Sequence, residues 1–299
     1  MACAAHVILV DAPPGADDHA RRRLQELERR WSRFLPQSDV SRLNAAPEAM
    51  LVVAPDTVRL VTTMLHAWRA TGGRYDPTQL EAVNAAGYSA SVGPSGRASS
   101  RPRGRRDGSC AGDVRVHDTA PLVAVPSGVG LDPGGIGKGL AADIVVRELL
   151  KRGAAGVLVG IGGDLACAGT PPEPDGWRVA VEDPFDRSRT LATFALAAGG
   201  AATSSTLTRA WVRDGEQRHH VIDPSTGACA ATDLAAVTVF ARAGWEAEAH
   251  ATAALLTGSA GALDYLEETG LQGIVTTLAG DTTSTPALAP AGDGEWSAA

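Results

Sequence analysis

A glycine-rich segment around a rare lysine is the most distinctive chemical feature of the sequence. Residues 132–139 read Asp-Pro-Gly-Gly-Ile-Gly-Lys-Gly, and Lys138 is one of only two lysines in the chain. Glycines let backbone N–H groups approach an anion, and a lysine where a helix begins adds a full positive charge. The spacing matches neither a Walker A loop nor a G-x-G-x-x-G dinucleotide loop. A phosphate-binding loop and an ordinary tight turn both remain open.

A carboxylate and a hydroxyl four residues apart form the second candidate. Glu248 and Thr252 lie on a predicted helix, so their side chains share one face. Two hard oxygen ligands suit Mg²⁺, which usually fills its shell with water and substrate phosphate. His250 points to another face, which argues against a zinc site of the H-E-x-x-H type. A solvated glutamate beside a helix-facing threonine is the alternative.

Two histidines before a turn form the third candidate. His219 and His220 lead into Val-Ile-Asp-Pro-Ser-Thr-Gly, in which aspartate and proline favour a tight turn. His220 could act as a general base near neutral pH. A structural turn carrying two surface histidines is the alternative. A weaker signal is Gly162-Gly163-Asp164, which follows a predicted buried strand.

The elements that must position these residues alternate between strands and helices. Apolar periodicity, proline and glycine predict a loop or short strand over residues 31–44 and an irregular tail from about residue 280. Helices are predicted to start near Asp17 and after Pro55, and over residues 139–152, 246–256 and 260–268. Strands are predicted over residues 6–10, 122–125, 156–161, 177–182, 191–196, 210–213, 219–222, 235–241 and 273–278. This order predicts a mixed α/β (α+β) fold with mixed sheets flanked by helices.

Composition limits the class of protein. The chain has 299 residues, 44% of them hydrophobic, and a formal charge of −7. This is ordinary globular usage, and the acidity argues against a nucleic-acid binder. No run is apolar enough for a membrane span. The four cysteines show no disulfide or zinc spacing, and the first residues make a poor secretory signal, so we expect a cytoplasmic protein.

Residues 89–113 differ from the rest of the chain. They are rich in glycine and serine and contain five arginines between Arg97 and Arg106. We expect a flexible, solvated loop, and an arginine patch for phosphates is the alternative. The domain is therefore expected to span residues 1–280 with this loop inside it, followed by an irregular tail at 281–299.

Taken together and in order, the motifs resemble those of the ApbE family of FAD:protein FMN transferases. The resemblance covers most of the chain. It rests on Phe34 with Ser-Asp-Val-Ser-Arg-Leu-Asn (38–44), Gly-Arg-Tyr-Asp-Pro-Thr (73–78), Leu131 to Gly139 with Asp143, Ile-Gly-Gly-Asp (161–164), Gly-Trp-Arg-Val-Ala-Val-Glu-Asp-Pro (176–184), Ala-Thr-Ser (202–204), His220 to Gly227, and Glu248 to Thr252.

The resemblance implies both a reaction and a set of site residues. In that family Mg²⁺ binds the FAD pyrophosphate, and the FMN moiety passes to a Ser or Thr hydroxyl of an acceptor protein with release of AMP. It assigns the metal, Mg²⁺ or Mn²⁺, to Glu248, Thr252 and the Gly135 carbonyl. His220 matches the residue that activates the acceptor hydroxyl, and Lys138 is assigned to catalysis as well as to FAD. The positions that match FAD contacts are Met1, Phe34, Tyr75, Asp76, Asp132, Lys138 and Ile222.

The chain also departs from the family pattern. Glu248 stands where the family usually has aspartate, and residues 84–88 lack the usual tryptophan before Gly87. Two alternatives to the transferase therefore stay open: an Mg²⁺-dependent FAD pyrophosphatase that gives FMN and AMP, and a non-catalytic FAD-binding protein.

Overall fold

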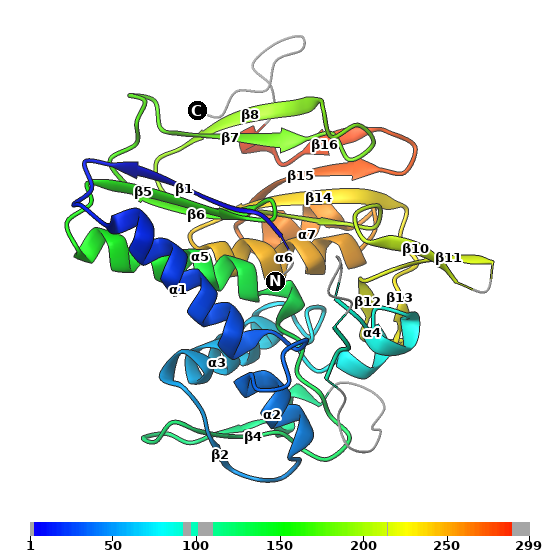
Figure 1. Cartoon of the computed structure of the whole chain (residues 1–299). Helices are drawn as coiled ribbons and strands as arrows, with labels where there is room; N and C mark the ends of the chain where they lie inside the picture. The colour runs from blue at the N-terminus through cyan, green and yellow to red at the C-terminus, as the bar shows by residue number, and fades with distance from the viewer. Residues whose placement is uncertain (1–2, 92–96, 101–109, 214, 289–299) are drawn as a thin grey trace. The chain divides into compact units, whose positions relative to one another are not determined.

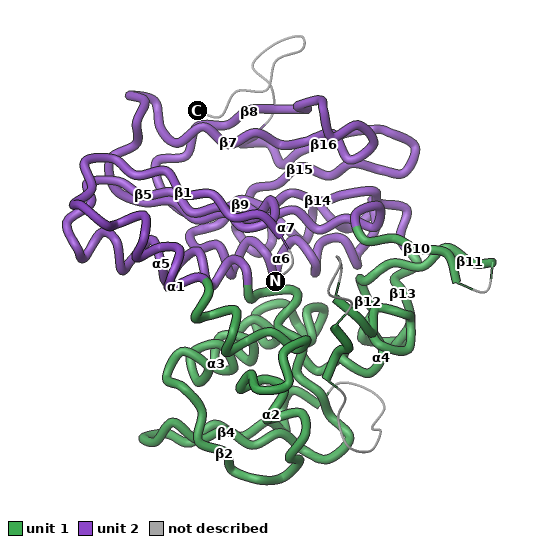
Figure 2. Tube along the Cα trace, in the orientation of Figure 1, with its two compact units in different colours: residues 1–2, 25–137, 209–231 green, residues 3–24, 138–208, 232–299 purple. Residues whose placement is uncertain are grey.

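The chain folds into two compact units, shown in different colours in Figure 2. The computed structural model describes residues 3–91, 97–100, 110–213 and 215–288. The first unit contains residues 25–137 and 209–231, and the second contains residues 3–24, 138–208 and the chain from Thr232 onwards. Among the described helices, none combines the length and the hydropathy that a membrane span requires.

A seven-stranded sheet forms the framework of the second unit (Figure 1). All neighbouring strands in it pair antiparallel. Their order across the sheet is β1 (Ala5–Val10), β5 (Gly156–Ile161), β6 (Asp164–Gly169), β9 (Gly199–Ser205), β14 (Leu234–Ala241), β15 (Gln272–Thr277) and β16 (Thr282–Ser284). The central strands are buried almost throughout, as expected of a sheet covered on both faces.

Helices cover one face of this sheet, and a hairpin packs against the other (Figure 1). The helices are α5 (Gly137–Lys151), α6 (Gly244–Leu256), α7 (Ala262–Glu268) and the first part of α1 (Ala16–Trp31). The hairpin consists of β7 (Trp177–Glu182) and β8 (Thr190–Leu196). Its buried side chains, among them Trp177 and Phe194, form a core with Leu158 and Phe240 of the sheet.

Helices α5 and α6 touch backbone to backbone. A Cβ added at Gly139 would lie 2.2 Å from the Gly244 carbonyl oxygen, and one at Gly200 would lie 2.4 Å from the Gly244 nitrogen. The Asp143 carboxylate, one turn along α5, accepts hydrogen bonds from the N–H groups of Gly244 (2.8 Å) and Trp245 (3.1 Å) and so caps the start of α6. Glycine is therefore required where the two helices meet.

The first unit consists of short helices, small sheets and turns. Its helices are α2 (Asp39–Ala45), α3 (Pro55–Ala70), α4 (Leu80–Ala86) and the end of α1 from Gln25. A three-stranded sheet has the order β2 (Leu51–Val52), β4 (Leu122–Ala124) and β3 (Arg115–Val116). Two hairpins complete it, β10 (Ala210–Arg213) with β11 (Glu216–His219) and β12 (Ile222–Asp223) with β13 (Ala228–Cys229). Single 3-10 turns occur in it at Ala111–Asp113 and Pro133–Gly135, and a further one occurs in the second unit at Pro286–Leu288.

The predicted α+β class is confirmed, but the described strands pair antiparallel where mixed sheets were expected, and several local predictions are wrong. Residues 39–45 form helix α2 rather than a loop, because the Ser38 side chain caps it by accepting from the Ser41 N–H at 3.0 Å. Strands β6 and β9 and helix α4 were not predicted, and the histidine segment pairs over 216–219 instead of 219–222. Thr282–Ser284 form β16 inside the segment expected to be irregular. The prediction for the rest of the tail, residues 289–299, lies outside the described residues.

The expectation for residues 89–113 is only partly met. Residues 92–96 and 101–109 lie outside the described residues. Arg97 is exposed as expected, but the Ser91 N–H donates to its carbonyl at 2.8 Å, and the Ser99 N–H donates to the Ser89 carbonyl at 2.7 Å. Ser99 is buried. The described part of this segment is thus packed into the first unit and is not a purely solvated loop.

Candidate functional site

A buried group of three charged side chains lies in the second unit. The Lys138 ammonium is 2.7 Å from Asp164 Oδ2 and also contacts Glu248 Oε1. The Asp164 and Glu248 side chains are each only 4% exposed. We call these three residues the Lys138 cluster. Its members are far apart in sequence, so only the fold brings them together.

Each member of the cluster comes from an element with a fixed position. Lys138 lies in the first turn of α5, and Glu248 lies one turn after the glycine contact that joins α5 to α6. The Gly139 N–H donates to Glu248 Oε2 at 2.8 Å, so the carboxylate also caps the N-terminus of α5. Asp164 follows the two-glycine turn between β5 and β6, in which Gly162 and Gly163 adopt φ values of 61° and 100°.

When both carboxylates are ionised, the cluster carries one negative charge in excess, because one ammonium then faces two carboxylates. Burial alone would lower the pKa of Lys138, but Asp164 and Glu248 together raise it above its ordinary value, so the ammonium stays charged. Burial, reinforced by the Asp164 charge and opposed by Lys138, raises the pKa of Glu248 to about 7. A buried negative charge without full compensation favours the binding of a further cation.

Two hydroxyl groups lie on α6 one turn after Glu248 and on the strand β9 beside it. The Thr252 and Ser204 hydroxyls are 2.9 Å apart, and Thr252 Oγ1 also donates to the Glu248 carbonyl at 3.3 Å. Within the described part of the chain, no three His, Cys, Asp or Glu side chains are grouped in a way that could hold a metal by themselves. A metal here would therefore take one or two carboxylates, a hydroxyl and oxygens from the backbone, water or substrate. That donor set fits Mg²⁺.

His250 belongs to the core and not to this site. It is 5% exposed, and the Tyr265 hydroxyl lies 2.7 Å from its Nδ1. Burial lowers the pKa of His250 to about 4, so the ring is neutral at physiological pH. The prediction that His250 points away from Glu248 and Thr252 agrees with these contacts. The pair connects α6 to α7.

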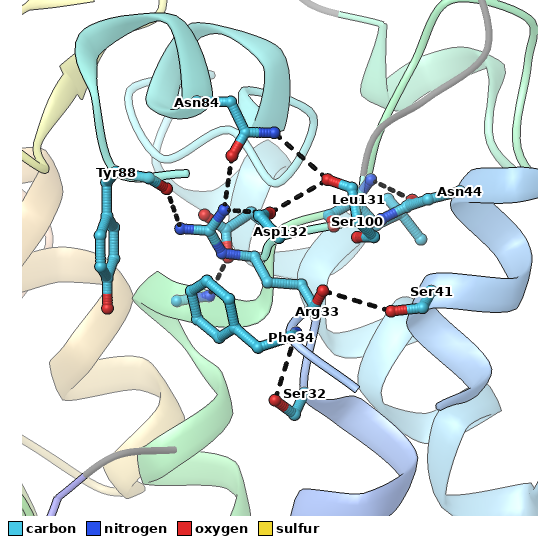
Figure 3. A network of polar contacts seen from close by, with 12 residues as sticks. Ser32, Arg33, Phe34, Ser41, Asn44, Asn84, Tyr88, Ser100, Leu131 and Asp132 are labelled. Atoms are coloured by element: carbon cyan, nitrogen blue, oxygen red, sulfur yellow. Dashed lines mark hydrogen bonds and ion pairs between the residues drawn. The ribbon is translucent and has the colours of Figure 1, made fainter. Parts of the chain in front are cut away.

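Two predicted FAD contacts, Phe34 and Asp132, lie in the first unit beside the buried Arg33 (Figure 3). Arg33 is 3% exposed and donates to Asn84 Oδ1 (3.0 Å), Ser99 Oγ (2.6 Å) and the Tyr88 carbonyl (3.0 Å). Its guanidinium carbon lies 4.4 Å from the centre of the Phe34 ring and 4.8 Å from that of Tyr88. Such stacking of a guanidinium on two rings fixes their orientation. Phe34 is thus held in place by its neighbour in sequence.

Arg33 also reaches the loop that precedes Lys138. Its Nε is 3.5 Å from Asp132 Oδ1, and the same carboxylate oxygen accepts from the Gly134 N–H at 3.0 Å. Asp132 thereby caps the turn Pro133–Gly135. Asn44 fixes the preceding residue, Leu131, through its N–H (2.7 Å) and its carbonyl (3.0 Å). The start of the glycine-rich segment is therefore fixed by side-chain hydrogen bonds and an ion pair within the first unit.

The predicted contacts Tyr75 and Asp76 lie next to this loop. The Asp132 N–H donates to the Pro77 carbonyl at 2.8 Å. Asp76 accepts from the N–H of Thr78 (2.8 Å) and from Gln79 Nε2 (2.9 Å), so both its oxygens stabilise a local turn. Tyr75 is 4% exposed. The structure brings Tyr75, Asp76, Asp132 and Phe34 together in one unit, and their roles toward FAD stay predictions.

His220 lies between the two hairpins of the first unit, and Ile222 is the first residue of the second hairpin. Ile222 pairs with Cys229 and is buried, while His220 is partly exposed. His219 Nε2 lies 3.2 Å from the Ala230 carbonyl, and burial lowers the pKa of His219. His219 and His220 are both partly exposed, and the role of His220 as a base stays a prediction. The remaining predicted contact, Met1, lies outside the described residues.

Three side chains that matter to these sites were missed or undervalued from the sequence. Arg33 was not singled out, Ser204 appeared only within a motif of the resemblance, and Asp164 appeared there and as a weak signal. Their partners are distant in sequence: Asn84 is 51 residues from Arg33, and Thr252 is 48 residues from Ser204. The available signal was an aspartate directly after a buried strand and two glycines, a place where a charge needs a partner.

Comparisons with known proteins agree with the fold and the motifs. The ApbE family model matches residues 1–275. The FAD:protein FMN transferase of Salmonella typhimurium is 34% identical over 137 residues, 46% of this chain and 39% of that protein. The one of Treponema pallidum is 29% identical over 269 residues, 82% of this chain and 73% of that protein. The chain thus spans about two fifths of the Salmonella protein and almost three quarters of the Treponema protein.

A solved structure has the same fold. The ApbE protein from Thermotoga maritima superposes with a TM-score of 0.79 at 22% identity, over 94% of this chain and 92% of that one. At this identity the likeness concerns the fold alone. The family model, by contrast, matches the chain almost from end to end and includes the glycine-rich loop, the histidine turn and helix α6. This protein belongs to the ApbE family.

Proposed function

We propose that this protein is an FAD:protein FMN transferase that requires a divalent metal. The observation that carries the proposal is the Lys138 cluster, in which two buried carboxylates share one ammonium at the start of α5, with Thr252 one helical turn after Glu248. The comparisons support the proposal because relatives named FAD:protein FMN transferase match much of the chain. FAD would be the substrate and a second protein the acceptor.

The residues that would hold the metal are Glu248 and Thr252, and the resemblance adds the Gly135 carbonyl. Mg²⁺, or Mn²⁺ in its place, would neutralise charge on the FAD pyrophosphate. Lys138 would contribute a second positive charge toward the phosphates. A metal held by Glu248 would take over part of the charge compensation that Lys138 supplies there, which would leave the ammonium able to contact the substrate as well as Asp164.

The transfer itself needs a nucleophile and a base. The hydroxyl oxygen of a Ser or Thr on the acceptor would form a bond to the FMN phosphorus, and the bond between that phosphorus and the oxygen of the AMP phosphate would break. His220 would take the hydroxyl proton. Phe34, Tyr75, Asp76, Asp132 and Ile222 would bind the flavin nucleotide.

The test is incubation of the protein with FAD, Mg²⁺ and candidate acceptor proteins, followed by flavin fluorescence in a denaturing gel and mass spectrometry. A transferase leaves FMN covalently on the acceptor and releases AMP in equal amount. Free FMN and AMP without labelled protein would indicate a pyrophosphatase. Tight FAD binding without either product would indicate a flavin-binding protein.

A matched pair of variants ties this activity to the site. Glu248→Gln removes the metal-binding charge, whereas Glu267→Gln removes the same charge from an exposed position on α7. The first should abolish labelling and the second should leave it unchanged.

A further inference from the structure

Asp164 has a connection to the cluster that the proposed function does not use. Its Oδ2 is 2.7 Å from the Lys138 ammonium, and its Oδ1 accepts from the Thr203 N–H at 3.2 Å. The side chain is 4% exposed and follows a two-glycine turn. Asp164 is therefore held by the sheet, independently of α6.

Strand β9 connects Asp164 to the candidate metal ligands. Thr203 holds Asp164 through its N–H, and the next residue, Ser204, contacts the Thr252 hydroxyl at 2.9 Å. Thr203 is itself fixed by the Thr238 hydroxyl of β14 at 2.8 Å. One strand thus sets the position of Asp164 relative to Thr252.

The arrangement gives the Lys138 ammonium two carboxylate partners, Asp164 and Glu248. If a cation binds the Glu248 carboxylate, Lys138 must give up that contact. An ammonium left without a partner in a buried site is strongly disfavoured. Asp164 prevents this, because it remains bound to Lys138 after the cation has replaced the ammonium at Glu248.

We propose that Asp164 is a positioning residue that retains Lys138 when a divalent cation binds Glu248, and so makes the exchange of the ammonium for the cation possible. The inference rests on the proposed metal site at Glu248 and Thr252, and it goes beyond the family resemblance by giving Asp164 a role through Lys138. Asp164 acts here without touching the cation.

The experiment measures Mn²⁺ binding to the full-length protein without FAD, by the loss of the free Mn²⁺ electron paramagnetic resonance signal at pH 8. Asp164→Asn should weaken Mn²⁺ binding at least tenfold, because a cation on Glu248 then leaves the Lys138 ammonium without a carboxylate partner. Lys138→Met should bind Mn²⁺ at least as tightly as the parent, because it removes the competing ammonium. The double variant D164N/K138M should recover at least tenfold over D164N. Glu267→Gln, the exposed charge control, should bind like the parent.

Three outcomes would overturn the inference. They are parent-like binding in D164N, a double variant as weak as D164N, and a parent protein that binds no Mn²⁺. The second outcome would mean that Asp164 is a direct ligand or supports the fold. Circular dichroism checks each variant. If D164N does not fold, the K138M variant tests the inference. Weaker Mn²⁺ binding by K138M than by the parent would mean that the ammonium does not compete with the cation for Glu248.

Failure of this inference and failure of the proposed function are distinguishable. The binding series contains no FAD, so it can succeed in a protein that transfers no FMN. Conversely, if the parent protein labels its acceptor and D164N binds Mn²⁺ as the parent does, the proposed function stands. Only the proposed role of Asp164 is then wrong.

Discussion

Replacing Glu248 by glutamine should remove a specific pH dependence from the stability of the metal-free protein. The folded state raises the pKa of Glu248 from an ordinary value of 4.5 to about 7, chiefly through burial. Between these two values the folded chain binds more protons than the unfolded chain. The stabilisation that this carboxyl contributes is therefore fully present below about pH 4.5 and is lost as the pH rises through 7.

The size of the effect follows from the same two values. Each pKa unit corresponds to about 1.4 kcal/mol, so the free energy of unfolding should fall by about 2–3 kcal/mol between pH 5 and pH 8 through this group alone. Glu248→Gln cannot ionise and should not show this loss. Lys138 stays charged across the range, because its pKa is raised above the ordinary lysine value.

The assay is urea unfolding in EDTA at pH 5, 6, 7 and 8, with the parent, Glu248→Gln and Glu267→Gln measured in parallel. The difference in unfolding free energy between the parent and Glu248→Gln should change by about 2–3 kcal/mol in favour of the variant as the pH rises. Mg²⁺ at pH 8 should restore stability to the parent and not to Glu248→Gln. Parallel dependence of unfolding free energy on pH for the parent and Glu248→Gln from pH 5 to 8 would mean that folding does not raise the pKa of Glu248.

Four further expectations concern other parts of the site. Lys138→Ala should weaken FAD binding or turnover by about 1.5–3 kcal/mol, the value of a charge-assisted hydrogen bond, measured by FAD titration and initial rates. His220→Asn should lose FMN transfer yet retain FAD, measured by labelling and by flavin fluorescence titration. Gly139→Ala should lower the melting temperature far more than Gly137→Ala, because a Cβ at 139 would lie 2.2 Å from backbone oxygen and one at 137 would lie 3.3 Å from a proline side chain. Glu248→Asp should keep or raise activity, and Mn²⁺ should serve at least as well as Mg²⁺, both measured by the rate of acceptor labelling.

Each of these has a contrary result. Parent-like FAD binding and turnover in Lys138→Ala would make the glycine-rich segment a simple turn. Retained transfer in His220→Asn would remove that histidine from the mechanism. Equal melting temperatures for the two glycine variants would mean that α5 and α6 can separate without cost. An inactive Glu248→Asp would show that the site is built for the longer side chain.

Elements with a strong pattern could be predicted from the sequence. The bounds of β5 and β7 agree with the prediction residue for residue, because the first is an unbroken apolar run and the second alternates buried and exposed side chains. The start of α5 at the glycine-rich segment was also predictable to within two residues.

Elements without such a pattern could not be predicted from the sequence. Strand β9 reads Gly-Gly-Ala-Ala-Thr-Ser-Ser and owes its extended form to its neighbours β6 and β14, not to its own composition. Helix α2 has only seven residues, too few to show a period, and depends on the cap from Ser38. Short elements of this kind are decided by tertiary contacts.

The same distinction holds for the site. Glu248 and Thr252 are one turn apart on α6, so their proximity follows from helix geometry. The contact between Lys138 and Glu248 joins residues 110 positions apart and depends on the close approach of Gly139 to Gly244. Asp164 and Arg33 acquire their partners in the same way. No local pattern encodes such contacts.

The most direct test of the central claim is the metal dependence of acceptor labelling. The intact mass of an acceptor protein is followed during incubation with FAD while Mg²⁺ is titrated from EDTA upwards. We expect the mass of FMN to be added only when Mg²⁺ is present, and Glu248→Gln to add none at any Mg²⁺ concentration. Full labelling in EDTA, or by Glu248→Gln, would contradict it.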